Sequence, residues 1–239
     1  MPRKLNYKQT IILRLVLRFR YVTSDNLAVT RNITQNSAYS ALEILNKADY
    51  LGKIYDKSFR LQNKSARYYL TQQAIDYLRK TIDINLADNI WISRKNDSKR
   101  STDFIDYLVS IHSSYNKLKS QSDNDVMVKT ALELYDIEGI IKPLPSLMVE
   151  PKHGNSFFVE LTDSQHLFLI KKRIRKYIEN YDSNDWEWAK YPNIYLIRAN
   201  SPSDRSKLRQ YIKEIIDDNY LDDDDFSFLV ISSVDQIKI

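Results

Sequence analysis

Amide, hydroxyl and basic side chains recur at helical spacing in the segment from Thr34 to Ala48. Asn36, Ser40 and Lys47 share one face of a helix here, because separations of four and seven residues are close to whole turns. An asparagine or glutamine amide donates and accepts hydrogen bonds at once, as contact with base edges in the major groove of DNA requires. The candidate contact residues on this helix are Gln35, Asn36, Tyr39, Ser40 and Lys47.

The opposite face of this segment is apolar, which predicts a helix packed against a core. Thr34 is suited to cap the helix, and the apolar stripe is formed by Ala38, Ala41, Leu42, Leu45 and Ala48. A shorter helix from Thr23 to Thr30, with Leu27 buried, precedes it. The pair predicts a helix-turn-helix, whose second helix would read bases.

A basic hairpin is predicted directly after the second helix. Leu51 to Asp56 and Ala66 to Leu70 have the composition of strands, and four cations lie in and between them: Lys57, Arg60, Lys64 and Arg67. A hairpin tip in this position is expected to contact sugar-phosphate. With a helix from Tyr7 to Arg20 and a closing helix from Gln72 to Lys80, the segment is typical of an otherwise all-α winged helix-turn-helix. The alternative is a small helical core whose charges form only a solvated surface.

The length of the chain favours two domains, and the charge is unevenly distributed. The 239 residues are 43% hydrophobic and 28% charged. Residues 1–80 contain 15 Lys and Arg against 5 Asp and Glu, a net charge of +10, and the remainder contains 21 against 26, a net charge of −5. A basic first third is expected if only that part meets a polyanion. We predict a DNA-binding domain over residues 1–92, a polar linker over 93–101 and an α/β domain over 102–239.

Composition argues against several other classes of protein. Cysteine is absent, so disulfides and thiolate metal sites cannot form. His112, His153 and His166 lack the spacing of a zinc site, and the three glycines form no phosphate-binding loop. We therefore expect no cofactor and no small-molecule substrate. Without a run of about 18 apolar residues or an apolar secretory signal at the N-terminus, we expect a cytoplasmic protein that does not contact a membrane.

Helices and strands alternate in the C-terminal part of the chain. The expected helices run from Asp103 to Lys119, from Phe168 to Tyr181 and from Ser203 to Asp217. The expected strands run from Val126 to Thr130, Ser146 to Glu150, Ser156 to Leu161, Asn193 to Arg198 and Phe226 to Ser232, the second and third forming a hairpin. This alternation favours an α/β sheet covered by helices.

The order of these elements resembles the replication-relaxation family of plasmid-associated proteins. The local matches are Phe19 to Thr23, Ala41 to Leu45, Tyr68 to Thr71, Pro145 with Ser146, Phe157 to Glu160 and Lys172 to Tyr177. The resemblance implies a winged helix followed by a domain similar to restriction endonucleases. It also implies a double-stranded DNA-binding protein acting in plasmid or mobile-element replication, transfer or transcriptional control.

The chain departs from the nuclease site that this resemblance implies. Such a site needs an Asp on one hairpin strand and an acid followed two residues later by Lys on the next, so that carboxylates hold a divalent ion. Ser146 stands where the Asp is typical, and Thr162 stands where the Lys is needed after Glu160. We therefore expect a degenerate nuclease-like domain without metal or catalysis, used for dimerisation or partner contact.

Two alternatives to the DNA-binding hypothesis stay open. One is a metal-dependent DNA nuclease or relaxation enzyme with a migrated site, formed by Glu160, Asp163 and Lys172. The other is a protein-interaction module, in which the acidic C-terminal part and the basic hairpin both contact proteins. The leading hypothesis names double-stranded DNA as the partner, with a homodimer as a further expected contact.

Overall fold

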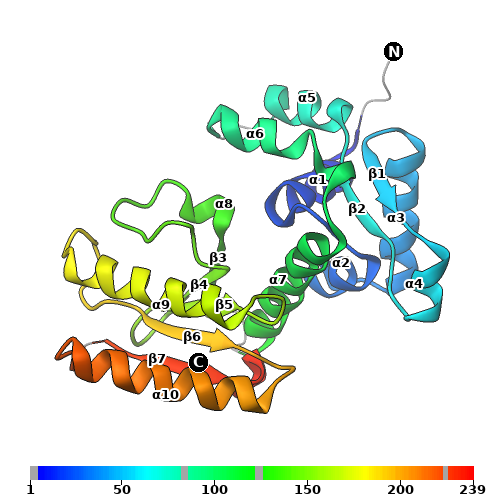
Figure 1. Ribbon diagram of the computed structural model, residues 1–239. Coiled ribbons are helices and arrows are strands. Elements are labelled where there is room, and N and C mark those ends of the chain that lie inside the picture. Colours follow the sequence, from blue (N-terminus) through cyan, green and yellow to red (C-terminus); the bar gives the residue numbers. More distant parts are fainter. Residues whose placement is uncertain (1–4, 82–85, 122–125, 223–225) are drawn as a thin grey trace. The chain divides into compact units, whose positions relative to one another are not determined.

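The computed structural model describes residues 5–81, 86–121, 126–222 and 226–239, with the side chain of Arg60 outside the described part. The chain divides into two compact units, Met1–Asn116 (unit 1) and Lys117–Ile239 (unit 2). The mixed α and β composition that the sequence predicts is confirmed, since helices and strands both occur along the chain (Figure 1). The expectation that the N-terminus lacks a secretory signal depends partly on residues 1–4. These residues lie outside the part of the chain that the structure describes.

Three helices open unit 1, namely α1 (Tyr7–Phe19), α2 (Ser24–Arg31) and α3 (Gln35–Lys47). Asn6, Thr23 and Thr34 precede them, and the side chain of each accepts a hydrogen bond from a backbone NH in the first turn. Such caps satisfy donors that the helix leaves unpaired, and their loss costs about 1 kcal/mol each. The helices pack through side chains that are completely buried, including Leu13, Val16, Leu27, Ala38, Leu42 and Leu45.

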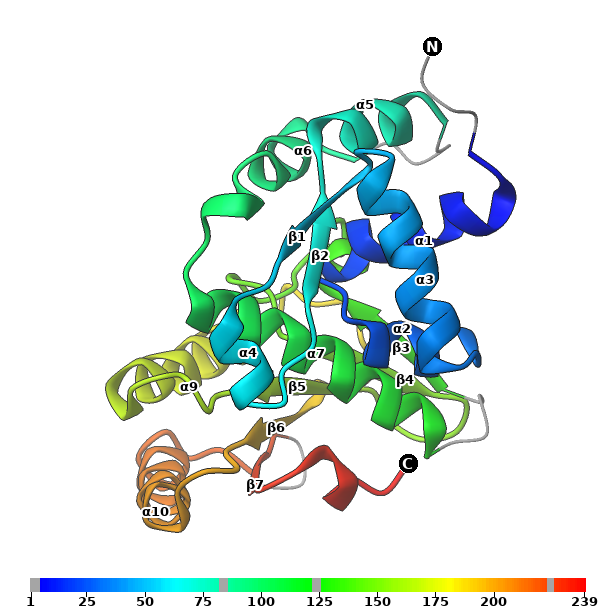
Figure 2. The ribbon, with the colours of Figure 1, turned by 90° about the vertical axis from the view of Figure 1, so that its right-hand side faces the viewer.

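A two-stranded antiparallel sheet follows α3. Strand β1 (Leu51–Ile54) pairs with β2 (Arg67–Leu70), and α3 lies beside both strands (Figure 2). Between the strands we predicted a hairpin tip, but the structure contains a short helix, α4 (Lys57–Leu61). Asp56 starts this helix by accepting a 2.6 Å hydrogen bond from the backbone NH of Ser58. Helix α5 (Gln72–Thr81) follows the sheet, as predicted.

The segment predicted as a linker, residues 93–101, is folded into unit 1. It contains the end of α6 (Asp88–Arg94) and a single-turn helix, η1 (Asp97–Lys99). Asp97 is completely buried; its carboxylate lies 2.6 Å from Arg20 Nη2, and its carbonyl accepts a 2.6 Å hydrogen bond from the Tyr21 hydroxyl. The linker prediction is wrong because this polar run is not solvated: its acid, Asp97, is buried and forms an ion pair with Arg20, whose side chain is 12% exposed.

Helix α7 (Thr102–Ser120) lies mostly in unit 1, so the predicted domain boundary before residue 102 differs from the one that the structure shows. Its polar side chains bond to α2 and thereby tie residues 102–116 to unit 1. Asn116 Nδ2 donates to the carbonyl of Asn26 at 3.0 Å, and Thr30 Oγ1 lies 2.7 Å from His112 Nε2. These contacts join residues about 80 to 90 positions apart, which sequence periodicity does not reveal.

His112 is a completely buried histidine at this junction between α2 and α7. Its ring stacks on Phe19, with centroids 3.7 Å apart and an interplanar angle of 5°. Burial, with a further contribution from the positive charge of Arg18, lowers the pKa of His112 from 6.5 to about 3. The ring is therefore neutral in the folded protein throughout the physiological pH range.

Unit 2 is built on a five-stranded sheet in the order β3-β4-β5-β6-β7. Its strands are β3 (Val126–Thr130), β4 (Leu147–Pro151), β5 (Phe157–Leu161), β6 (Asn193–Ile197) and β7 (Phe228–Ile231). The first three run antiparallel, and β5, β6 and β7 run parallel to one another. The hairpin predicted from Ser146 to Leu161 is confirmed by the pairing of β4 with β5.

Two long helices connect the parallel strands and cover one face of the sheet (Figure 1). Helix α9 (Leu167–Asp182) joins β5 to β6, and α10 (Pro202–Asp218) joins β6 to β7. Successive crossovers that advance in one direction across a sheet place their helices on the same face when both are right-handed. The shared core includes Met148, Phe158, Ile174, Tyr177, Ile194, Leu208 and Ile212. Two single-turn helices, α8 (Ala131–Leu134) and η2 (Val234–Gln236), complete the unit.

The lowered pKa of His112 predicts a specific loss of stability in acid. Below pH 6.5 the unfolded chain takes up a proton that the folded ring does not accept until about pH 3. The stabilisation is therefore complete above pH 6.5 and declines as the pH falls from 6.5 toward 3. Urea unfolding at pH 7 and pH 4.5 should show that the wild type loses about 2–3 kcal/mol more than His112→Gln on acidification. Asp97 titrates in both proteins, so an equal loss in the two would contradict the role assigned to His112.

Candidate nucleic-acid interface

Helix α3 presents one continuous exposed face to the solvent. All five residues predicted to contact DNA from this helix are exposed in the structure: Gln35, Asn36, Tyr39, Ser40 and Lys47. Ile44, which the sequence reasoning did not select, lies on the same side with 45% of its surface exposed. The face therefore combines amide, hydroxyl, aromatic, aliphatic and ammonium groups, and an aliphatic side chain is the type that contacts the thymine methyl group.

The turn between α2 and α3 fixes where this face begins. Asn32 ends α2 in the left-handed conformation, with φ 50° and ψ 53°, which an asparagine adopts more readily than most residues. The backbone NH of Ile33 then donates to the carbonyl of Ala28 at 3.0 Å. At the start of α3, the Gln35 amide donates to the carboxylate of Asp25 in α2. The two helices are thus joined by a short turn with its own hydrogen bonds.

The carboxylate of Glu43 connects α3 to both strands of the small sheet. Its Oε1 accepts hydrogen bonds from Lys53 Nζ in β1 at 2.7 Å and from the Tyr68 hydroxyl in β2 at 2.6 Å. Partial burial raises the pKa of Glu43, but these two hydrogen bonds and the charge of Lys53 outweigh that effect, so the pKa is lowered. Glu43 therefore stays ionised and holds three elements together.

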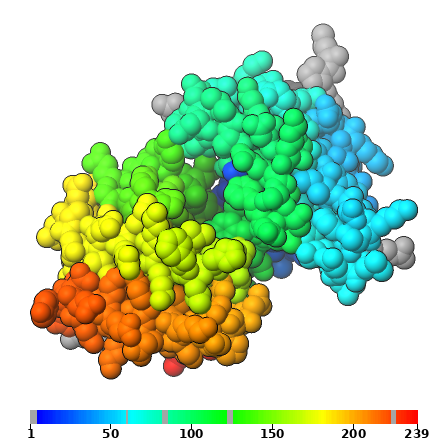
Figure 3. Space-filling view, in the orientation of Figure 1, coloured from blue at the N-terminus to red at the C-terminus, as the bar shows by residue number. Residues whose placement is uncertain are grey.

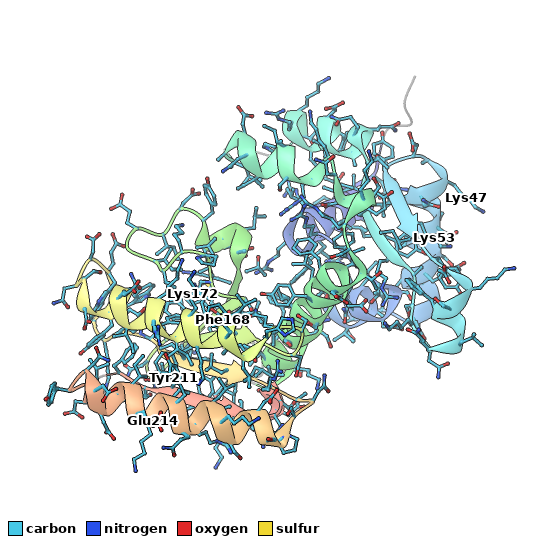
Figure 4. All side chains as sticks on the ribbon, in the orientation of Figure 1. Lys47, Lys53, Phe168, Lys172, Tyr211 and Glu214 are labelled. Atoms are coloured by element: carbon cyan, nitrogen blue, oxygen red, sulfur yellow. The ribbon has the colours of Figure 1, made fainter. Side chains whose placement is uncertain are left out.

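Lys53 is a basic residue of this surface that the sequence analysis missed. Its ammonium lies 5.8 Å from the ring centre of Tyr39, 5.7 Å from that of Tyr55 and 5.8 Å from that of Tyr68. Lys47 of α3 and Lys53 of β1 lie on the same side of unit 1 (Figure 4). Lys53 stands opposite Tyr68 in the strand pairing, a relation that appears only once the register is known.

The predicted basic hairpin divides into residues with different roles. Lys57 is exposed on α4, where it can meet a phosphate, whereas the side chain of Arg60 lies outside the described part of the structure. Lys64 Nζ is 2.8 Å from Asp106 Oδ2, and Arg67 Nη2 is 2.8 Å from Asp106 Oδ1. The guanidinium of Arg67, which is 4% exposed, also lies 4.3 Å from the ring centre of Phe59.

The prediction that Arg67 contacts phosphate directly is therefore wrong. A buried guanidinium already bonded to a carboxylate cannot reach the solvent without breaking that pair. Lys64 is only partly available, because its ion pair leaves 36% of the side chain exposed. The acid that engages both cations, Asp106, lies about 40 residues further along in α7, so the hairpin sequence alone gives no sign of it.

Glu160, the acid considered for a nuclease site in unit 2, lies in a closed cluster of hydrogen bonds. Glu160 is buried on β5, and Arg173 Nη2 and the Tyr177 hydroxyl, both on α9, lie 2.6 Å from its Oε1. Ser146 donates to Glu160 Oε2 at 3.3 Å. Burial raises the pKa of Tyr177 most strongly, and the charge of Glu160 adds to the effect, so the tyrosine remains a proton donor.

Asp163 and Lys172 do not join this cluster. Asp163 Oδ1 accepts backbone hydrogen bonds from Ala199 at 2.7 Å and Asn200 at 3.2 Å, which secures the loop after β6. Lys172 is exposed on α9, because the helix turns Ile170, Ile174 and Tyr177 toward the sheet. Arg173, the next residue along, reaches Glu160 instead, so the predicted grouping of Glu160, Asp163 and Lys172 is not found.

A search of known protein-family models finds no match to this chain, and no curated protein matches its sequence. Among the described residues, no three histidine, aspartate or glutamate side chains gather as a metal site would require. No helix within the same residues has the length and apolar character needed to cross a bilayer.

The ion pair between Arg67 and Asp106 predicts that Arg67 stabilises the fold, a role that is tested by measuring unfolding. Arg67→Met leaves Asp106 with Lys64 only and removes hydrogen bonds to a charged group, so we expect a loss of about 1–3 kcal/mol in the free energy of unfolding. The matched variant Lys57→Met removes an exposed cation of the same hairpin and should cost less than about 0.5 kcal/mol. Denaturant unfolding measures both, and equal losses would contradict the assignment.

Proposed function

We propose that this protein binds double-stranded DNA through unit 1, which acts as a winged helix-turn-helix. In this proposal α2 and α3 form the helix-turn-helix, α3 enters the major groove, and the β1–β2 hairpin with α4 contacts the backbone. The observation that carries the proposal is the exposed face of α3, whose amide, hydroxyl and basic groups stand on a helix that is capped, packed and anchored to the hairpin by Glu43.

The charge of unit 1 supports a polyanionic partner. Residues 1–116 contain 19 Lys and Arg against 10 Asp and Glu, a net charge of +9, whereas residues 117–239 contain 17 against 21, a net charge of −4. An excess of positive charge in one unit attracts nucleic acid over a distance of about 10 Å at ordinary ionic strength. Lys47 and Lys57, which are both exposed, are the cations that we assign to phosphate contacts at the edges of the α3 face.

For unit 2 we propose a degenerate restriction-endonuclease-like domain without catalytic activity, which serves in dimerisation or partner contact. Its hairpin, the parallel strand β6 and the intervening α9 support the likeness, and the Glu160 cluster supports the loss of activity. A divalent ion needs several oxygen ligands that are free to converge on it, but Glu160 is already bonded to Arg173, Tyr177 and Ser146. The resemblance to the replication-relaxation family supports a role in plasmid or mobile-element replication, transfer or transcriptional control.

Replacement of Asn36 tests whether α3 reads bases. A duplex preferred by the protein would first be selected from random sequences, and affinities for it and for random DNA would then be compared. Asn36→Ala should weaken binding to the preferred duplex by about 1–3 kcal/mol and binding to random duplex much less, because only a base contact depends on sequence. Gln72→Ala removes an exposed amide from α5 and serves as the control. Equal losses on both duplexes would contradict a base contact by Asn36.

Replacement of Glu160 tests the assignment of unit 2. We expect no cleavage of supercoiled, linear or single-stranded DNA by the wild type with magnesium or manganese. Glu160→Gln should leave DNA affinity nearly unchanged but lower the free energy of unfolding by about 3–5 kcal/mol, because Arg173 loses its buried partner. The exposed Glu179→Gln on α9 is the matched control for stability. Metal-dependent nicking that disappears in Glu160→Gln would instead establish the nuclease alternative.

A further inference from the structure

A cluster of cations without acidic partners lies on the exposed side of unit 2. Four belong to α9, namely Lys171, Lys172, Arg175 and Lys176, and the fifth, Lys142, lies in the loop between β3 and β4. None of the five forms an ion pair with any residue that the structure describes. Unit 2 as a whole carries net negative charge, so this concentration is a local feature and does not follow from its composition.

Aromatic side chains are interleaved with these cations. Lys171 Nζ lies 4.4 Å from the ring centre of Tyr211 on α10, and Arg175 donates from Nε to the Tyr211 hydroxyl at 2.8 Å. On the other side of α9, Lys142 Nζ lies 5.5 Å from the ring centre of Tyr135. Lys142, Lys171 and Arg175 are thus held at the surface by tyrosine side chains, which leave their positive charge available.

The surface continues into a shallow depression beside α9. The depression has a volume of about 270 Å³ and is lined by Ile140, Ile141, Lys142, Lys176, Glu179, Asn180 and Ser183. The ammonium groups of Lys142 and Lys176, with the polar side chains of Asn180 and Ser183, suit a phosphate. Glu179 is the acidic residue in the lining. We call the region formed by the five cations, Phe168 and Tyr211 the α9 surface.

Phe168 gives the α9 surface a feature that a duplex would not use. Its ring is 73% exposed, one helical turn before Lys172, and the neighbouring Leu169 is 49% exposed. Figure 4 shows Phe168 and Lys172 along α9, with Tyr211 on the adjacent α10, and Figure 3 shows α9 and α10 side by side on one face. The bases of a duplex are stacked on one another, whereas the bases of a single strand are free to stack on an exposed aromatic ring.

We infer that the α9 surface binds single-stranded nucleic acid, with Phe168 stacking on a base and Lys171, Lys172 and Arg175 contacting successive phosphates. Binding of a single strand without sequence preference requires cations placed along the nucleic-acid backbone and an aromatic ring on which a base can stack. The site is separate from the α3 face and does not depend on duplex binding by unit 1.

Fluorescence anisotropy of the full-length protein with a labelled oligo(dT) of about 16 nucleotides tests the inference. Phe168→Leu keeps an apolar side chain but removes the ring, and should weaken binding on the order of tenfold, whereas Phe168→Trp should retain it. The double variant Lys171→Gln with Lys172→Gln should lower the magnitude of the salt slope by about 1.4, because each single-strand phosphate contact contributes about 0.7. Its matched control, Lys207→Gln with Lys213→Gln on α10, should leave the slope unchanged.

Three outcomes would overturn the inference. They are failure of the wild type to bind the oligonucleotide, binding by Phe168→Leu that equals that of the wild type, and equal salt slopes in the two double variants. Capture by phosphatidylserine vesicles without binding of the oligonucleotide would instead identify a lipid-binding surface. Duplex binding measured on the same proteins distinguishes the two sites, because Phe168→Leu should leave duplex affinity unchanged. If Asn36→Ala weakens binding to the preferred and the random duplex equally while the single-strand results hold, only the role proposed for unit 1 is contradicted.

Discussion

The arrangement of the candidate DNA interface depends on the carboxylate of Glu43. This group bonds to Lys53 on β1 and Tyr68 on β2 from a position on α3, so the helix and the hairpin have one relative orientation. A single ion pair at a surface is worth little, but here a hydrogen-bonded tyrosine and partial burial accompany it. If α3 lies in a groove while the hairpin contacts phosphates, the helix and the hairpin must be held in a fixed relative position. The hydrogen bonds of Glu43 supply that constraint.

Ion pairing within the protein also distinguishes the cations that stabilise the fold from the cations that can bind a partner molecule. Arg20, Arg67 and Arg173 are each bonded to a carboxylate and largely buried, and removal of either partner would leave a buried charge uncompensated. Lys47, Lys57 and Lys172 are exposed, and none of them forms an ion pair with a described residue. The first group stabilises the two units, and the second group marks the surfaces on which a polyanion can be bound.

Local patterns in the sequence predicted the elements well, whereas contacts between distant residues could not be predicted. The caps at Thr23 and Thr34, the exposed face of α3 and the β4–β5 hairpin all follow from neighbouring residues. The roles of Asp97, Asp106 and Arg173 depend on partners brought close by folding. Without those partners, the sequence predicts a linker from a polar run, a phosphate contact from a structural arginine, and Lys172 instead of Arg173 as the residue that reaches Glu160.

The surface used by unit 1 can be mapped directly by following backbone amide NMR signals of the full-length protein during titration with a selected duplex. The proposal predicts that the largest shifts fall on α3, β1 and α4, around Asn36, Ser40, Lys53 and Lys57, with small changes in the buried core of unit 2. Shifts that avoid α3, or that concentrate around Glu160, would contradict DNA recognition by a winged helix in unit 1.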